Sequence, residues 1–256
     1  MAVQEGIDIF SSVPLYVMPK FGESKLSDAT GFLWFKNGQH WLITNWHVVS
    51  GRHPETEKCL HSQAGVPDRL TVFFQNIDLQ LDPIEVDVSL FDEETPTWSE
   101  HPDHGRKVDL AAIKIDVPHM SEANYCAINA IKSMDLRQRV GDRCYILGFP
   151  FGRQGYGFPV WKGGTFASEP YLSKITNEPI LVDSASRPGM SGSPVIQREY
   201  GQLEWEDGTI GPAVNGLGGS RLVGIYAGRL HTNDKNDAQI GRVWPIRFVE
   251  ELMAIL

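Results

Sequence analysis

Short apolar runs, rich in β-branched and aromatic residues, recur along the whole chain and are separated by Gly, Pro, Asn and Asp. Several of them alternate with a period near two, which is typical of strands that bury one face. Helical periodicity is scarce, and its clearest example is 247–256, where Phe248, Leu252 and Ile255 are predicted to share one face. About ten short strands without intervening helices predict an all-β barrel or sandwich rather than an α/β fold. The runs are 31–35, 41–45, 70–74, 84–90, 109–115, 144–149, 180–184, 194–197, 222–228 and 241–246.

Composition excludes several function classes. The 256 residues are 41% hydrophobic and 21% charged, values that are ordinary for a folded protein and argue against disorder or a coiled coil. No apolar run approaches the roughly 18 residues of a membrane span, so we expect no membrane partner. The net charge of −9 repels phosphate and disfavours a nucleic-acid partner.

The N-terminus and the cysteines bear on localisation. No basic region followed by an apolar region is visible at the N-terminus, so the sequence predicts no secretory signal. Cys59, Cys126 and Cys144 are odd in number and far apart, unlike a disulfide framework or a zinc site. We therefore predict reduced, mostly structural thiols in a cytoplasmic protein, and no metal.

The segment 117–140 has mixed composition and lies near the middle of the chain, so it is the candidate linker between two β halves, 1–124 and 125–256. Three polar insertions interrupt the strand pattern. They are 50–69, 92–107 and 201–220.

A glycine-rich turn is the most informative segment for chemistry. In SRPGMSGSPVI (186–196), Ser191 lies two residues after Gly189 and directly before Gly192. Glycine permits the tight backbone that aims successive N–H groups into one concavity, and a nucleophilic serine needs such groups to stabilise the oxyanion it creates. The alternative is an ordinary turn between strands.

A serine hydroxyl needs a base, and the base needs a carboxylate to orient it. His47 directly follows the apolar run 41–45 and is the outstanding base candidate, although a lone histidine is more often structural. Asp109 opens the buried run DLAAIKI and is the preferred orienter, because a carboxylate at such a position is costly unless it is paired. Asp103 and Asp116 are the weaker alternatives. His101 and His104 lack further metal ligands nearby and are interpreted as surface loop residues.

The order His47, Asp109, Ser191 is that of chymotrypsin-type enzymes. The chain also resembles the trypsin-like serine peptidases, and within them the bacterial high-temperature-requirement (Deg-type) proteases and the glutamyl endopeptidases. The segments that carry this resemblance span roughly residues 30 to 250 and include ITNWHVV, DLAAIKI, VGDRCYILGFPFG, PGMSGSPV, LVGIYAG and IGRVWPI.

The resemblance implies a double six-stranded β-barrel of chymotrypsin type with a short C-terminal helix from about Ile246, and no PDZ domain. It implies that His47 acts as general base and acid, Asp109 orients it and Ser191 is the nucleophile. The oxyanion hole would be formed by the backbone N–H groups of Gly189 and Ser191. A protein or peptide would be the substrate, and no cofactor would take part.

The chain departs from the family pattern at two places. Met190 stands where secreted trypsins carry the Asp that pairs with the new N-terminus, so we predict no zymogen switch of that kind. Ala185 and Tyr226 replace the Asp of trypsins and the His of glutamyl endopeptidases. Arg229 is interpreted as a solvated loop residue, and the alternative is that it helps to bind an acidic substrate. The P1 preference, that of the residue before the cleaved bond, is left open, with a small or medium apolar residue as first choice. The predicted substrate pocket comprises Ala185, Ser186, Tyr226, Ala227, Gly228 and Gly241.

Two alternatives are weighed against an active serine endopeptidase. A catalytically silent or latent trypsin-like fold would serve as a protein-binding module. An esterase of the α/β-hydrolase fold conflicts with the motif order and with the scarcity of helices. We also predict that loop packing, the substrate or a regulatory protein partner orders the oxyanion hole. The activity should be sensitive to the loops 201–220 and 230–239, which we expect to contribute to that order, and low in the isolated protein.

Overall fold

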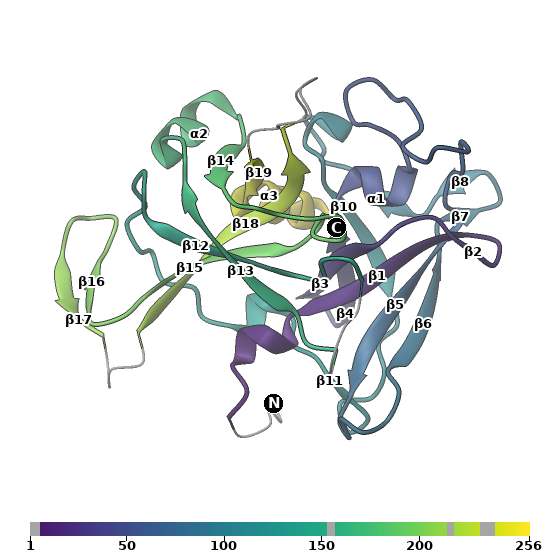
Figure 1. Ribbon diagram of the computed structural model, residues 1–256, viewed down its shortest axis with the longest axis horizontal. Coiled ribbons are helices and arrows are strands. Elements are labelled where there is room, and N and C mark those ends of the chain that lie inside the picture. Colours follow the sequence, from purple (N-terminus) through teal and green to yellow (C-terminus); the bar gives the residue numbers. More distant parts are fainter. Residues whose placement is uncertain (1–5, 153–156, 214–217, 231–238) are drawn as a thin grey trace.

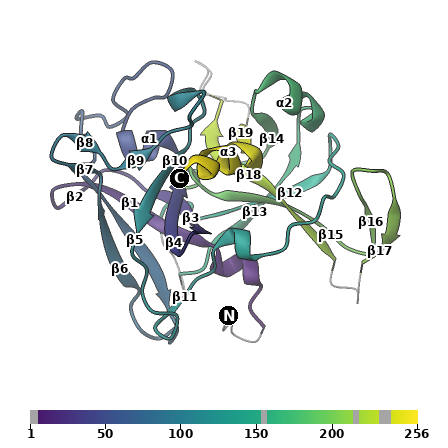
Figure 2. The same cartoon turned by 180° about the vertical axis from the view of Figure 1, so that it is seen from behind.

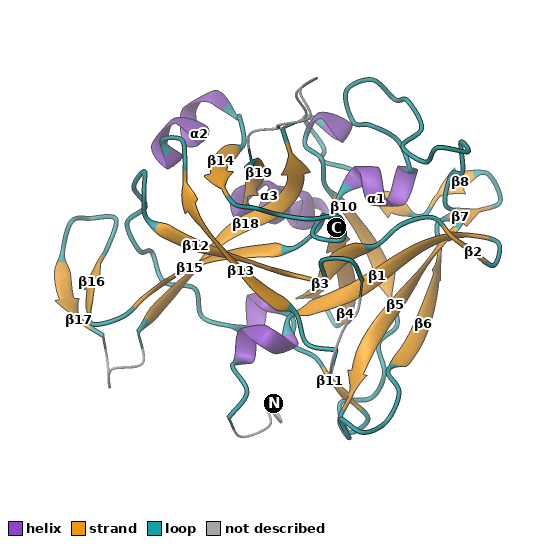
Figure 3. Cartoon of the chain, in the orientation of Figure 1, coloured by secondary structure: helices purple, strands orange, loops and turns teal. Residues whose placement is uncertain are grey.

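The computed structural model describes residues 6–152, 157–213, 218–230 and 239–256. Strands make up most of its regular structure (Figure 3). They form two sheets that lie side by side, one built from the N-terminal half of the chain and one from the C-terminal half (Figure 1). The predicted all-β fold of chymotrypsin type is confirmed.

The N-terminal half forms a nine-stranded antiparallel sheet whose main path runs β11-β5-β1-β3-β4-β10-β9. Its hydrogen-bonded path is open, so this half is a half-barrel rather than the closed ring implied by the family resemblance. The strands are β1 (Pro14–Phe21), β2 (Ser24–Lys25), β3 (Ala29–Lys36), β4 (Gln39–Thr44), β5 (Arg69–Asn76), β6 (Ile84–Ser89), β9 (Trp98–Ser99), β10 (Ala111–Ile115) and β11 (Ala123–Asn124). A separate hairpin pairs β7 (Phe91–Asp92) with β8 (Thr95–Pro96).

The C-terminal half forms a closed barrel in the order β12-β13-β14-β19-β18-β15. Its strands are β12 (Arg143–Gly148), β13 (Val160–Phe166), β14 (Ile180–Asp183), β15 (Pro194–Glu199), β18 (Gly219–Arg229) and β19 (Ile240–Pro245). The predicted insertion 201–220 contains a two-stranded hairpin of β16 (Gln202–Glu204) and β17 (Ile210–Pro212). Residues 214–217 of that insertion lie outside the described residues.

Helices are short. They are η1 (Ile9–Ser12), α1 (Trp46–Ser50), η2 (Gly105–Lys107), η3 (Ile128–Ala130), α2 (Pro170–Thr176) and α3 (Ile246–Ile255). Within the described residues, none is long and apolar enough to cross a membrane. The candidate linker 117–140 contains β11, which pairs with β5, and then η3. A domain boundary at residue 124 stays a prediction.

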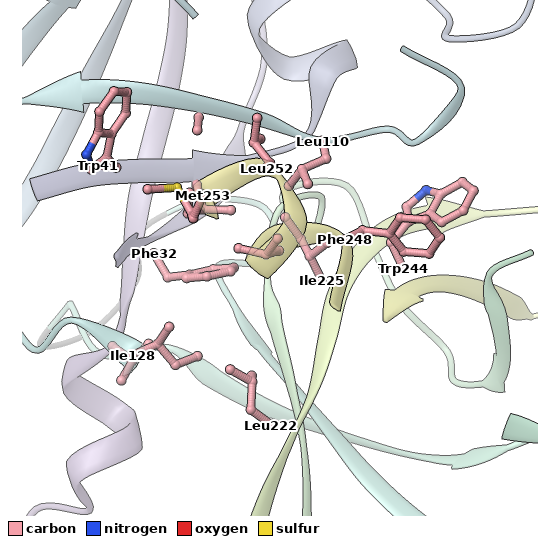
Figure 4. Close-up of a cluster of buried hydrophobic side chains, with 14 of the residues drawn as sticks. Phe32, Trp41, Leu110, Ile128, Leu222, Ile225, Trp244, Phe248, Leu252 and Met253 are labelled. Atoms are coloured by element: carbon pink, nitrogen blue, oxygen red, sulfur yellow. The ribbon is translucent and has the colours of Figure 1, made fainter. Parts of the chain in front are cut away.

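The largest apolar cluster lies between the two halves and is covered by α3, which is seen best from behind (Figure 2). Phe248 and Leu252 are fully buried there with side chains from both sheets, including Phe32 and Ile225 (Figure 4). The prediction of α3 from Ile246 is confirmed. Its predicted face is partly wrong, because Ile255 is 62% exposed. The buried stripe also contains Val249 and Met253, which shifts its centre and leaves Ile255 at the edge.

The three cysteines differ in their burial. Cys59 and Cys144 are free thiols, and Cys126 is buried. Burial raises the pKa of Cys144 to about 12 and also raises that of Cys126.

Candidate active site

His47 is held in a helix of a single turn that follows β4. Asn45 occupies the N-cap position of α1 without a capping side-chain hydrogen bond, and Gly51 ends the helix in a left-handed conformation with its N–H donating to the His47 carbonyl at 3.1 Å. The flanking side chains of Trp46 and Val48 are buried, whereas the His47 side chain is 18% exposed. The short helix therefore fixes the backbone of His47 and leaves its ring accessible at the surface.

Asp109 reaches His47 because β10 pairs with β4. The register places Ala111 opposite Thr44, so the residues just outside the two strands meet. Asp109 Oδ2 lies 2.6 Å from His47 Nδ1, and Asp109 Oδ1 accepts from the His47 backbone N–H at 2.9 Å. This buried carboxylate is thus compensated by two donors of one residue. Because the carboxylate faces Nδ1, that nitrogen carries the proton and Nε2 is left as the acceptor.

The other two acidic candidates do not contact His47. Asp116 follows the far end of β10 and is exposed, and Asp103 is exposed in the loop before η2. Among the three carboxylates that the sequence offered, the structure brings only Asp109 to the imidazole.

Ser191 lies in the loop between β14 and β15 and lines the same pocket as His47 and Asp109. Its carbonyl accepts from the Thr30 N–H at 2.8 Å, which ties the loop to β3 of the other half. Within the described residues, no hydrogen bond joins the Ser191 and His47 side chains. Such a loose arrangement is common in the absence of substrate.

The backbone N–H groups around Ser191 divide into two sets. Those of Met190, Gly192 and Ser193 donate to the carbonyls of Arg187, Tyr226 and Met190, respectively. Those of Gly189 and Ser191 have no acceptor among the described residues. These two are the donors that were predicted to form the oxyanion hole.

Two hydrogen bonds fix the peptide planes on either side of Gly189. The Phe151 N–H donates to the Pro188 carbonyl at 2.9 Å, and the Thr30 hydroxyl donates to the Gly189 carbonyl at 2.8 Å. Because the described peptide bonds are trans, the Gly189 N–H points away from the Phe151 side, opposite to the Pro188 carbonyl. Neither Thr30 nor Phe151 belongs to the loops 201–220 and 230–239 that were predicted to order this segment. Residues 231–238 of the second loop lie outside the described residues.

Gly189 also meets a steric limit. Its φ is +96°, and a Cβ at this position would lie 2.2 Å from the Phe149 carbonyl oxygen. A side chain there would have to displace backbone. Met190, the next residue, is 1% exposed and packs in the apolar core of the barrel.

Two buried residues with hydroxyl groups line the pocket. Ser186 and Tyr226 are hydrogen-bonded to each other through Oγ and the phenolic oxygen. Burial raises the pKa of Tyr226, while the Ser186 hydrogen bond and the charges of Arg229 and Arg242 act against this rise. The Tyr226 ring covers Gly241, where a Cβ would lie 2.4 Å from the ring.

Four of the six predicted pocket residues line the pocket, namely Ser186, Tyr226, Ala227 and Gly228. Ala185 and Gly241 are not among the described lining residues, and Gly241 instead lies behind Tyr226. Sequence reasoning missed several lining residues: nothing in the pattern of the loop 50–69 or of β19 marked four of them, and the other two lie in the turn 186–196, which was considered only for its serine and glycines. The missed residues are His53, Pro54, Leu60, Arg187, Pro188 and Arg242.

His101 is a correction to the sequence analysis. It is buried rather than on the surface, with its Nε2 2.9 Å from Glu251 Oε2 of α3 and its ring stacked on His104. The loop before Asp109 thereby contacts the C-terminal helix. Among the described residues, no cluster of three or more His, Cys, Asp or Glu could hold a metal ion.

Comparison with known proteins defines the class. A family model for the trypsin-like peptidase domain matches residues 29–203, and the chain belongs to this family. No curated protein matches the chain in sequence.

Among solved structures, the chain is similar to a serine endoprotease from Yersinia pestis, with a TM-score of 0.55 and 15% identity, over 96% of this chain and 62% of that one. The chain thus spans less than two thirds of the Yersinia chain. The inactive form of the Rv3671c protease is similar with a TM-score of 0.47 and 18% identity, over 96% of this chain and 89% of that one. Rv3671c is a protein of M. tuberculosis H37Rv. Deg5 is similar with a TM-score of 0.47 and 18% identity, over 94% of this chain and 86% of that one.

Proposed function

We propose that this protein is a serine endopeptidase that hydrolyses peptide bonds through an acyl-enzyme. The observation that carries the proposal is the double hydrogen bond of Asp109 to His47 at a pocket shared with Ser191. Membership of the trypsin-like peptidase family supports it.

In the proposed reaction, Ser191 Oγ attacks the carbonyl carbon of the cleaved bond while His47 Nε2 accepts the hydroxyl proton. The carbonyl oxygen becomes an oxyanion, which accepts from the N–H groups of Gly189 and Ser191. Asp109 stabilises the imidazolium and keeps its Nε2 toward the pocket. His47 then donates its proton to the departing amine, leaving an ester on Ser191.

Water completes the cycle. His47 Nε2 accepts a proton from a water molecule, and the resulting hydroxide attacks the ester carbonyl. Collapse of the second tetrahedral intermediate returns the proton to Ser191 Oγ and releases the carboxylic acid. All groups used in these steps are side chains and backbone amides of this chain, and no cofactor is needed.

A latent binding module remains the second candidate, and one observation favours it. The hydrogen bond between Ser191 and His47 is absent from the described structure, as it would be in a protein whose triad does not operate. The hydrogen bonds of Asp109 to His47 support the peptidase instead, as do the backbone N–H groups of Gly189 and Ser191, which have no acceptor among the described residues.

A fluorophosphonate probe distinguishes these candidates, because it phosphonylates only an activated serine. We expect stoichiometric labelling of Ser191 in the wild-type chain and none in Ser191→Ala. In His47→Ala the rate of labelling should fall by about 10⁴-fold or more. Asp116→Asn is the control and should be labelled at the wild-type rate, because Asp116 is exposed at the far end of β10. Unlabelled wild-type protein, with folding verified by circular dichroism, would favour the binding module.

A further inference from the structure

The pocket beside Ser191 is lined by two buried side chains that carry hydroxyl groups. Tyr226 is 1% exposed and Ser186 is 2% exposed, and both line the pocket. The Tyr226 ring occupies the space above Gly241, between β18 and β19. An apolar side chain of a substrate that reaches these two residues therefore meets polar groups.

The two hydroxyls leave one hydrogen without an acceptor. Ser186 Oγ and the Tyr226 oxygen share one hydrogen bond, which uses one of their two hydrogens. Neither oxygen has another partner within the described residues. Because buried polar groups are almost always hydrogen-bonded, the remaining hydrogen requires an acceptor, which a substrate oxygen can provide.

The charges around the pocket are cationic although the chain carries a net charge of −9. Arg187, Arg229 and Arg242 line the pocket, whereas its one lining carboxylate, among the described residues, is Asp109, which is already bound to His47. Within the described part of the chain, Arg229 has no ion-pair partner. Arg242 has only a long contact of 3.7 Å to the exposed Glu55, and its Nε is buried without a hydrogen bond.

We propose that this pocket binds an acidic side chain of the substrate, Asp or Glu, at the residue preceding the cleaved bond. The carboxylate accepts from the free hydroxyl hydrogen of the Ser186–Tyr226 pair and is paired by Arg229, with Arg242 contributing positive charge. This specificity rests on the proposed endopeptidase function. It replaces the apolar preference that was the first choice from the sequence.

The chemistry separates an acidic side chain from its closest neighbours. A glutamine side chain supplies an oxygen acceptor of the same shape but no charge for the arginines. A leucine side chain leaves the hydroxyl hydrogen without an acceptor, and a lysine side chain is repelled by the arginines. Glutamate against glutamine is therefore the most selective comparison.

The test uses one peptide sequence with Glu, Asp, Gln, Leu or Lys before the cleaved bond. Because charge-assisted hydrogen bonds are stronger than neutral ones, we expect the acidic peptide to exceed the Gln peptide by about 10- to 100-fold in kcat/KM. Arg229→Gln should reduce this ratio to about three or less, and Tyr226→Phe should reduce cleavage of the acidic peptide. Arg143→Gln, at an exposed position on β12, should leave the ratio unchanged.

Labelling of Ser191 by the fluorophosphonate probe separates failure of the specificity from failure of the function. If each variant labels at the wild-type rate, its catalytic groups remain assembled and the peptide ratios report on the pocket. Three results in a protein that is labelled would overturn the acidic specificity alone. They are preferred cleavage after Leu or Lys, no cleavage after Glu or Asp, and a ratio of acidic to Gln cleavage that Arg229→Gln leaves unchanged. Wild-type protein that neither labels nor cleaves would overturn the proposed function and this inference with it.

Discussion

Gly189→Ala is the substitution that most sharply probes the oxyanion hole. The added Cβ would lie 2.2 Å from the Phe149 carbonyl oxygen, which is backbone and cannot rotate away. The φ of +96° is strained for any residue with a Cβ. The segment can relieve the clash only by moving the peptide plane that carries the Gly189 N–H.

The expected fall in kcat follows from the loss of the Gly189 N–H as a donor to the oxyanion. Losing one oxyanion donor raises the barrier by about 2.7–4 kcal/mol, which is a fall in kcat of about 10²–10³-fold. The backbone strain adds a loss of folding stability of order 1–3 kcal/mol. We therefore expect Gly189→Ala to be folded at low temperature, less stable, and nearly inactive.

Two other glycines separate strain from the steric clash. Gly208 has a φ of +84° with no atom within 4 Å of a Cβ, so Gly208→Ala should show the strain alone and keep its kcat. Gly163 has open space and no positive φ, so Gly163→Ala should change neither quantity. Peptide hydrolysis and urea unfolding measure the two effects. A Gly189→Ala protein with wild-type kcat and the stability of Gly208→Ala would refute the account of the hole.

Three further predictions concern the supports of the site and the core. Thr30→Val removes the hydroxyl that hydrogen-bonds the Gly189 carbonyl and the Phe149 N–H. Urea unfolding should show a fall in unfolding free energy of about 1–3 kcal/mol for each of these groups, and kcat should be lower. An unchanged kcat would show that this hydroxyl does not hold the oxyanion hole. Phe248→Ala should cost about 3–5 kcal/mol in unfolding free energy, whereas Ile255→Ala should stay within about 0.5 kcal/mol; equal losses would contradict the described face of α3. At pH 8 a maleimide should label Cys59, while Cys144, with its pKa raised to about 12 by burial, stays protonated and unlabelled until the chain unfolds; fast labelling of native Cys144 would contradict this.

The strand pattern predicted the fold class well, because strands that bury one face alternate visibly in the sequence. It could not predict the pairing. Register and closure depend on contacts between distant segments, so neither the open path of the N-terminal sheet nor the hairpin in the insertion 201–220 was visible beforehand. The face of α3 was misjudged at Ile255 for a related reason: the width of the buried stripe depends on what the helix packs against.

The sequence predicted the side chains of the candidate site but not the residues that orient its backbone. Ser191, His47 and Asp109 are marked by glycines and by adjacent apolar runs, and pairing of β4 with β10 brings the last two together. Thr30 and Phe151 gave no signal, since they act on peptide planes whose orientation no local pattern encodes.

The sequence did not predict that Arg229 and Arg242 line the pocket, for a similar reason. Arg229 and Arg242 stand at ordinary strand and loop positions in the sequence. Whether such a residue is solvated or faces a pocket depends on the pairing of β18 with β19. The predicted role of Gly241 failed because the Tyr226 ring occupies the space beside it.

The central claim is that Ser191 forms a covalent acyl intermediate assisted by His47. Rapid mixing of the protein with an activated nitrophenyl ester, followed by mass measurement of the intact chain and its peptides, tests this most directly. The account predicts a burst of nitrophenolate equal in amount to the protein, with the acyl mass on the peptide that contains Ser191, and neither signal in Ser191→Ala. A wild-type chain without a burst, or an acyl group that persists in Ser191→Ala, would contradict it.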